Sequence, residues 1–124
     1  MKKRILVVDD SMYMRTMIDE TLTEAGFEIV GQAANGEDAI DLALELEPDL
    51  ITLDNILPDM IGIDILKILK VDEELSSKII MVSAVGQETV INEGMKLGAS
   101  DYIVKPFSPE FLLDSVQKAF EKDA

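Results

Sequence analysis

Three aspartates follow the ends of two strongly apolar segments. Asp9 and Asp10 come directly after Ile5–Val8. Asp54 comes directly after Leu50–Leu53. In a parallel α/β sheet the carboxyl ends of the strands face the ligand-binding crevice, so acids at those ends would share one pocket. Carboxylate oxygens are ligands of hard cations such as Mg²⁺, which also binds phosphate oxygens. The pattern therefore predicts a pocket that holds a divalent cation and handles phosphate.

A hydroxyl and an ammonium group follow two further apolar segments. Ser83 comes after Lys78–Val82, and Lys105 comes after Tyr102–Val104. A lysine in such a pocket would bind one phosphoryl oxygen, and a serine hydroxyl would donate to another. A carboxylate held beside them could act as a nucleophile toward phosphorus. These side chains together point to phosphoryl transfer.

Each of these side chains also has a purely structural interpretation. Asp9 or Asp10 could cap the helix that follows them. Asp54 could be a turn residue, Ser83 could cap a helix, and Lys105 could be a solvated surface lysine. Taken one at a time, the structural interpretation is the stronger for each residue. Their shared position at the ends of four strands favours a functional site, because structural requirements would scatter them over both edges of a sheet.

Strand-like apolar runs alternate with amphipathic helical runs along the whole chain. Each helical run stops at a Gly or a Pro or at the end of the periodic pattern. This alternation predicts a parallel sheet with helices on both faces and right-handed connections. The expected strands and helices are, in turn, Ile5–Val8, Met12–Ala25, Glu28–Gln32, Gly36–Glu47, Leu50–Leu53, Gly62–Lys70, Lys78–Val82, Glu88–Leu97, Tyr102–Val104 and Pro109–Lys122.

The composition excludes several kinds of chemistry and several classes of partner. The chain has no cysteine and no histidine, which excludes disulfides, thiolate or imidazole metal ligands, and a histidine general base. Its formal charge of −14 repels nucleic acids and anionic membrane surfaces. The chemistry must therefore use carboxylates, hydroxyls, lysine and the backbone.

The length of 124 residues and a hydrophobic fraction of 48% predict one domain, residues 1–124, with a core of its own. The basic start Met1–Arg4 is followed by only four apolar residues before Asp9. That run is too short for a signal peptide or a membrane-spanning helix. We therefore expect a soluble, cytoplasmic, monomeric protein that binds neither membranes nor nucleic acid.

Four motifs are spread along most of the chain. They are Ile5-Leu6-Val7-Val8-Asp9-Asp10-Ser11, Asp54 followed by Pro58 and Gly62, Ser83-Ala84, and Lys105-Pro106-Phe107. With these motifs the sequence resembles two-component response-regulator receiver domains over about residues 3 to 121. The resemblance implies a doubly wound (βα)5 flavodoxin-like fold, a three-layer sandwich around a five-stranded parallel sheet in the order 2-1-3-4-5.

The resemblance implies a role for each acidic candidate. Asp54 would be the phosphoacceptor. Mg²⁺ would be bound by Asp10, by Asp54 and by the backbone carbonyl of Ile56, and Asp9 would bind it through a water molecule. The site would therefore accept a phosphoryl group only with Mg²⁺ as cofactor.

The resemblance also assigns the remaining side chains. Lys105 and Ser83 would contact phosphoryl oxygens, and the peptide bond before Pro106 would be cis. Ser83 and Tyr102 would form a switch that links the site to a partner surface on the fourth helix, fifth strand and fifth helix. In this chain the expected surface comprises Gln87, Glu88, Ile91, Met95 and Tyr102.

Two segments, Met12–Arg15 and Ser83–Gln87, resemble the chemotaxis branch of the family. This implies a signalling switch that takes a phosphoryl group from a CheA-like histidine kinase and then binds a flagellar switch protein or an archaeal motor adaptor. Because an acidic residue, Glu88, lies at the start of the partner surface, the archaeal adaptor is the favoured partner of the two. Such a protein is a switch with weak self-catalysed phosphoryl transfer and autodephosphorylation, and is not an enzyme.

Two other functions remain as alternatives. A single-domain phosphorelay intermediate would pass the phosphoryl group on to a histidine phosphotransfer protein. A hydrolase that works through an aspartyl phosphate would need the pattern Asp-x-Asp, whereas Asp9 is followed two residues later by Ser11. The sequence therefore argues against the hydrolase and leaves the phosphorelay open.

Several positions near Asp54 depart from the family pattern. Asn55, Leu57 and Ile61 replace residues that are commoner there, but none of these changes removes a site group. The two side chains best placed to hold an attacking water are Ile56 and Val85, and neither can form a hydrogen bond to it. We therefore expect a long-lived phosphoryl state and a separate phosphatase.

Overall fold

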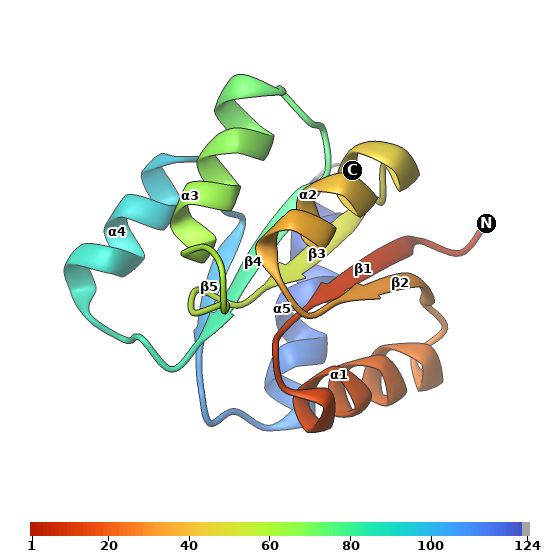
Figure 1. Cartoon of the computed structure of the whole chain (residues 1–124). Helices are drawn as coiled ribbons and strands as arrows, with labels where there is room; N and C mark the ends of the chain where they lie inside the picture. Colours follow the sequence, from red (N-terminus) through yellow and green to blue (C-terminus); the bar gives the residue numbers. More distant parts are fainter. Residues whose placement is uncertain (123–124) are drawn as a thin grey trace.

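The computed structural model describes residues 1–122; the last two residues of the expected domain, 123 and 124, lie outside the described residues. Strands and helices alternate along the chain (Figure 1). The elements are β1 (Arg4–Val8), α1 (Met12–Glu24), β2 (Glu28–Ala33), α2 (Gly36–Leu46), β3 (Leu50–Leu53), α3 (Gly62–Lys67), the π-helical turn η1 (Ile68–Asp72), β4 (Lys78–Ser83), α4 (Glu88–Lys96), β5 (Asp101–Val104) and α5 (Pro109–Glu121).

The five strands form one parallel sheet in the order β2-β1-β3-β4-β5, which confirms the expected doubly wound fold. The register brings the ends of β1 and β3 level, since Val8 pairs with Leu53. The backbone N–H of Asp54 continues this ladder by donating to the Val8 carbonyl at 3.0 Å. Asp9 and Asp54 therefore leave the sheet side by side, at its carboxyl edge.

Each face of the sheet has its own apolar core, because alternate strand residues point to opposite sides. Along β1, Ile5 and Val7 pack toward α1 and α5, whereas Leu6 and Val8 pack toward α2, α3 and α4 (Figure 1). All four side chains are buried. Burying an aliphatic side chain of this size is worth about 1.5–3 kcal/mol, so these layers hold the sheet and its polar edge in place.

The helices differ in how they begin. Ser11, Asn35 and Ser108 cap α1, α2 and α5 with side-chain oxygens that accept backbone N–H bonds. In contrast, the N-cap residues of α3 and α4, Ile61 and Gln87, make no capping hydrogen bond with their own side chains. The isoleucine is the more unusual residue there, because an N-cap position favours a short polar side chain.

The third helix ends differently from the expectation. The sequence pattern predicts one α-helix through Lys70, but α3 ends at Lys67 and the chain continues as the π-turn η1. In that turn the Glu73 N–H donates to the Ile68 carbonyl at 2.8 Å. The Lys70 ammonium stabilises the wider turn by donating to two carbonyls of the following loop, those of Leu75 and Ser77. These tertiary contacts have no counterpart in hydrophobic periodicity.

Among residues 1–122, none of the helices has the length and apolar character needed to cross a membrane.

Candidate functional site

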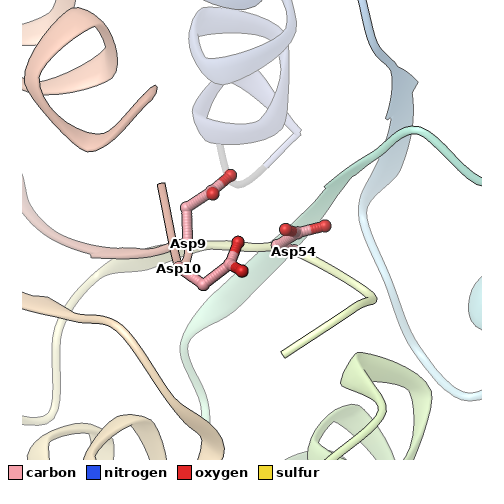
Figure 2. A group of neighbouring side chains, drawn as sticks. All are labelled: Asp9, Asp10 and Asp54. Carbon is pink, nitrogen blue, oxygen red and sulfur yellow. The ribbon is translucent and has the colours of Figure 1, made fainter. Parts of the chain in front are cut away.

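Three carboxylates meet at the carboxyl edge of the sheet (Figure 2). Asp9 and Asp10 come from the loop after β1 and Asp54 from the loop after β3, and one oxygen of each lies within 4.8 Å of the others. Asp9 and Asp54 are buried, whereas Asp10 is exposed. Figure 2 shows the carboxylates of Asp10 and Asp54 facing one another. A cluster of hard oxygen donors with one open side suits a divalent cation such as Mg²⁺.

The environment of Asp54 disfavours its charge. Burial raises the pKa of the Asp54 carboxyl above its ordinary value, and the nearby Asp9 carboxylate raises it further. The Lys105 ammonium and a hydrogen bond from the Ile56 N–H, at 3.4 Å, oppose this shift. Since the two raising causes prevail, the negative charge of the cluster is incompletely balanced, and a bound cation would relieve it.

Lys105 reaches across the sheet edge to both buried aspartates. Its Nζ lies 2.7 Å from Asp9 Oδ2 and 3.4 Å from Asp54 Oδ2. The Lys105 side chain is only 18% exposed, so the interpretation of a solvated surface lysine is wrong. The Lys105–Pro106 peptide bond is cis, as the family resemblance implies.

The helix-capping interpretation of the first two aspartates is also wrong. Ser11 is the N-cap of α1, and its hydroxyl accepts the Met14 N–H at 3.2 Å. The Asp9 carboxylate instead accepts the Ser11 N–H at 2.9 Å, which holds the turn between strand and helix. Because the cap is supplied by Ser11, the carboxylates of Asp9 and Asp10 are available to the cluster.

Ser83 and Tyr102 contact the same residue, Val85, of the loop between β4 and α4. The buried Ser83 hydroxyl accepts the Val85 N–H at 3.2 Å, so Ser83 does not cap α4, whose N-cap residue is Gln87. The Tyr102 hydroxyl donates to the Val85 carbonyl at 2.7 Å. Burial raises the pKa of the Tyr102 phenol, with Asp54 adding to the shift and the Ser83 hydroxyl opposing it. The two expected switch residues are thus linked through Val85.

The expected partner surface lies on α4 and β5. Glu88, Ile91 and Met95 lie on α4, with Gln87 at its start, and Tyr102 lies on β5. The sequence interpretation missed the hollow beside them, of about 440 Å³, between β5 and α5. Its apolar and partly exposed lining includes Tyr102, Val104, Phe107 and Phe111. Hydrophobic periodicity could not have predicted this hollow, because Val104 lies on β5 and Phe111 on α5.

Arg15 is a site neighbour that the sequence interpretation did not single out. Its guanidinium donates to the backbone carbonyl of Asp9 at 2.8 Å and to the side-chain oxygen of Gln32 at 3.1 Å. Gln32 in turn donates to Asp19 at 2.8 Å. This chain of contacts fixes the backbone at the first aspartate from the side of α1. The position of Arg15, one helical turn after Ser11, was the feature of the sequence that could have indicated this contact.

Asn55 and Gly62 close the loop behind Asp54. The Asn55 side-chain oxygen accepts the Ile63 N–H at 3.0 Å, and its backbone carbonyl accepts the Gly62 N–H at 2.7 Å. A Cβ on Gly62 would collide with the Asp54 carbonyl oxygen and would lie 2.7 Å from the Asn55 Cα. Only glycine allows this close approach of the two backbone segments.

Asp59 ties the same loop to α2. Its carboxylate accepts the backbone N–H groups of Gly36 at 2.7 Å and Glu37 at 3.0 Å. These two hydrogen bonds lower the pKa of the Asp59 carboxyl, the Gly36 bond having the larger effect. The loop that follows Asp54 is therefore anchored at both α2 and α3.

Comparison with known proteins gives consistent matches over most of the chain. The response regulator receiver domain family matches residues 5–117. The chain is 44% identical to the chemotaxis protein CheY of Thermotoga maritima, over 95% of this chain and 98% of that protein. It is 42% identical to CheY of Bacillus subtilis, over 95% and 98% of the two chains. A crystal structure of a CheX-CheY-BeF3-Mg complex from Borrelia burgdorferi matches with a TM-score of 0.91, 32% identity, and coverage of 95% and 89%.

Proposed function

The chain belongs to the response regulator receiver domain family, as a CheY-like chemotaxis signalling switch, and from this premise we propose that Asp54 accepts a phosphoryl group from a CheA-like histidine kinase. The observation that carries the proposal is the placement of Asp54. It is a buried carboxylate with a raised pKa, beside two further carboxylates and the Lys105 ammonium. We also propose that residues 1–124 form one receiver domain.

The proposed transfer uses one oxygen of Asp54 as the nucleophile. That oxygen forms a bond to phosphorus while the bond from phosphorus to the donor's imidazole nitrogen breaks, and the electron pair leaves with that nitrogen. Lys105 lies 3.4 Å from Asp54 Oδ2 and is placed to bind a phosphoryl oxygen. Ser83 is the proposed second donor, since it ends β4 beside the Lys105 backbone.

The proposed cofactor is Mg²⁺. Asp10, Asp54 and the Ile56 carbonyl would bind it directly, and Asp9 would bind it through water. When bound, the cation would neutralise charge on the phosphoryl oxygens and the carboxylates. Support comes from the oxygen donors of the cluster and from the related Borrelia CheY complex, which contains Mg and BeF3. BeF3 bound to a carboxylate has the shape of a phosphoryl group.

The proposed output is binding of a motor component, either a flagellar switch protein or an archaeal adaptor. The path begins at Ser83. If its hydroxyl turns to the phosphoryl group, it releases the Val85 N–H, and Val85, whose carbonyl accepts the Tyr102 hydroxyl, can then move. The partner surface on α4 and β5 would then rearrange. A ligand that binds the rearranged state better shifts the population toward it.

The phosphodonor has a candidate docking surface on α1. Met12 and Tyr13 are 72% and 78% exposed, and they follow Asp10 and Ser11 directly. A helix that presents a phosphohistidine could pack on these side chains beside the acidic cluster. The same surface would serve a kinase or a histidine phosphotransfer protein, so the phosphorelay remains the second candidate function.

The proposed phosphoryl state is long-lived and ended by a separate phosphatase. Ile56 is 56% exposed, and Ile56 and Val85 both line a groove beside the site, separate from the hollow between β5 and α5. Neither can hold a water molecule by a hydrogen bond. The related Borrelia CheY forms a complex with CheX, which supports a search for a CheX-type partner of this chain.

Labelling with acetyl phosphate tests the proposal. The wild-type protein should gain one phosphoryl group in the presence of Mg²⁺ and none in the presence of a chelator. Asp54→Asn should abolish labelling, and Asp10→Asn should weaken Mg²⁺ binding. Asp41→Asn, an exposed change of the same kind on α2, is the matched control and should behave as wild type. Labelling that persists in Asp54→Asn would refute the assignment of the phosphoacceptor.

A further inference from the structure

A groove of about 320 Å³ lies beside the acidic cluster, with lining residues from α3 and α4. These two helices are neighbours in Figure 1. The lining of the groove is mainly aliphatic and includes Ile56, Ile61, Val85 and Val90. Two of these side chains are unusually exposed for their type, Ile56 at 56% and Ile61 at 52%. We call this feature the α3–α4 groove.

Ile61 occupies a position where the local structure favours a polar residue. It is the N-cap of α3, with φ −89° and ψ 136°, and its own side chain makes no capping hydrogen bond. The Asn55 side-chain oxygen accepts the Ile63 N–H of the first turn instead. A short polar residue is the usual choice at such a position. Isoleucine cannot act as a cap, and it places about half of its apolar side chain in solvent. Because Asn55 already caps this turn, the exposed apolar side chain of Ile61 is not needed to begin the helix, and such a departure from local preference points to a functional requirement.

The two exposed isoleucines are held together. Ile56 and Ile61 form an isolated antiparallel bridge across the loop that follows Asp54. The Leu57 N–H also donates to the Met60 carbonyl at 3.2 Å within this loop. The pair is therefore a fixed apolar platform at the mouth of the groove. Preorganised apolar surface binds at a lower entropic cost than a flexible one.

The charge around the groove is negative. Asp64 on α3 and Glu93 on α4 also line the groove, and both are exposed. None of the described residues that line the groove is a Lys or an Arg. A second copy of this chain would bring a further formal charge of −14 to this face, which opposes self-association there. The complementary surface is therefore basic.

From these observations we propose that the α3–α4 groove binds a basic amphipathic segment of a partner protein. An aliphatic side chain of that segment would enter between Ile56, Ile61 and Val90. Flanking Lys or Arg residues would pair with Asp64 and Glu93. This arrangement follows the helix-in-groove mode of peptide recognition.

The groove is separate from the partner surface described above. On α4, Val90 and Glu93 lie three residues apart on one stripe of the helix, whereas Ile91 and Met95 lie four apart on another. A segment in the groove could therefore bind while a motor component occupies α4 and β5. The proposal does not require phosphorylation of Asp54, so the two can fail independently.

NMR titration of the ¹⁵N-labelled protein tests the groove. The probe is a synthetic Leu/Lys peptide of about 15 residues, long enough to form a helix, with its leucines on one stripe. A scrambled peptide of the same composition controls for charge alone. The striped peptide should bind roughly tenfold more tightly than the scrambled one. Its amide shifts should centre on Ile56, Ile61 and Val90.

Two variants and a matched control sharpen the test. Ile61→Ser removes the apolar contact at an exposed position and leaves the Asn55 cap of α3 in place, so a melting curve should show a folded protein. Affinity for the striped peptide should fall roughly tenfold. Glu93→Gln should weaken binding severalfold. Val71→Ser changes an apolar side chain of similar exposure, 50%, outside the groove lining and should leave affinity unchanged.

Four results would overturn the proposal. They are equal binding of the two peptides, an unchanged affinity in Ile61→Ser, shifts centred on the hollow around Phe111, or a concentration-dependent dimer that buries the groove. The third would assign the peptide to the β5–α5 hollow, and the last would make a second copy of the chain the occupant.

Discussion

The hydroxyl of Tyr102 donates a hydrogen bond of 2.7 Å to the backbone carbonyl of Val85. The N–H of the same residue donates to the hydroxyl of Ser83 at 3.2 Å. A side chain at the acidic edge and a side chain at the partner surface therefore hold the same residue of one loop. If either Ser83 or Tyr102 breaks its hydrogen bond to Val85, Val85 can move, and the hydrogen bond of the other residue changes as well.

This link predicts that Tyr102→Phe separates phosphorylation from output. The phenylalanine keeps the ring and loses the bond to Val85. Phosphorylation at Asp54 should be unchanged. The amide shifts that BeF3 and Mg²⁺ induce at Ile91 and Met95 should fall severalfold, as measured by NMR.

Ser83→Ala removes the hydroxyl that accepts the Val85 N–H. Like Tyr102→Phe, it should leave phosphorylation largely intact and weaken partner binding. A fully phosphorylated Ser83→Ala variant that binds its partner as wild type does would show that the Val85 contacts carry no signal.

We expect the lifetime of the phosphoryl group to depend on Ile56 and Val85. Replacing them by Ile56→Asn and Val85→Glu introduces groups that can hold an attacking water. Loss of the radioactive phosphoryl label should accelerate roughly tenfold, equivalent to about 1.4 kcal/mol of activation free energy. A wild-type protein that loses its label within seconds in Mg²⁺ buffer, without a helper, contradicts this account.

Asp59 should contribute to stability in a pH-dependent way. Its hydrogen bonds to Gly36 and Glu37 lower the pKa of the carboxyl in the folded state below the reference value of 3.8. The contribution is therefore complete above that value, and it is lost as the pH falls through the lower folded-state pKa. The difference in Tm between wild type and Asp59→Asn should be constant near neutral pH and should vanish in strong acid. Asp41→Asn, which lacks such contacts, should show no comparable trend.

Gly62 is required by the close approach of two backbone segments. Gly62→Ala would place its Cβ against the Asp54 carbonyl, so we expect a loss of at least about 1–3 kcal/mol in the free energy of unfolding. Labelling of Asp54 should fall in parallel. Gly94→Ala is the matched control, because a Cβ there has ordinary contacts of 3.4 Å or more and α4 gains helix propensity. Urea denaturation of both variants measures the difference.

The sequence predicts the features that depend on local pattern. Apolar runs identify the five strands, and the position of Asp9, Asp54 and Lys105 after those runs predicts their meeting at one edge. The strand order came from family resemblance, because periodicity cannot state which strands are neighbours. Choosing between capping and clustering for Asp9 and Asp10 required knowing that Ser11 caps α1.

The features that the sequence interpretation missed depend on contacts between distant segments. Arg15 reaches the Asp9 carbonyl, and Asp59 reaches α2, through side chains whose targets are backbone groups. Any residue type can supply a backbone N–H or carbonyl, so such pairs leave no trace in residue identity. The π-turn after α3 is similar, since its wider winding is stabilised by Lys70 and a loop that follows it.

The pairing of Val8 with Leu53 has a consequence for how this gene can change. Substitutions within β3 that keep volume and polarity preserve the edge at which Asp54 emerges. Insertion or deletion of one codon between Leu50 and Asp54 would turn the following side chains to the opposite face of the sheet. Asp54 would then leave Asp9 and Lys105 without their partner. Length variation among homologous genes should therefore be confined to the surface connections, and gaps should be absent from this strand.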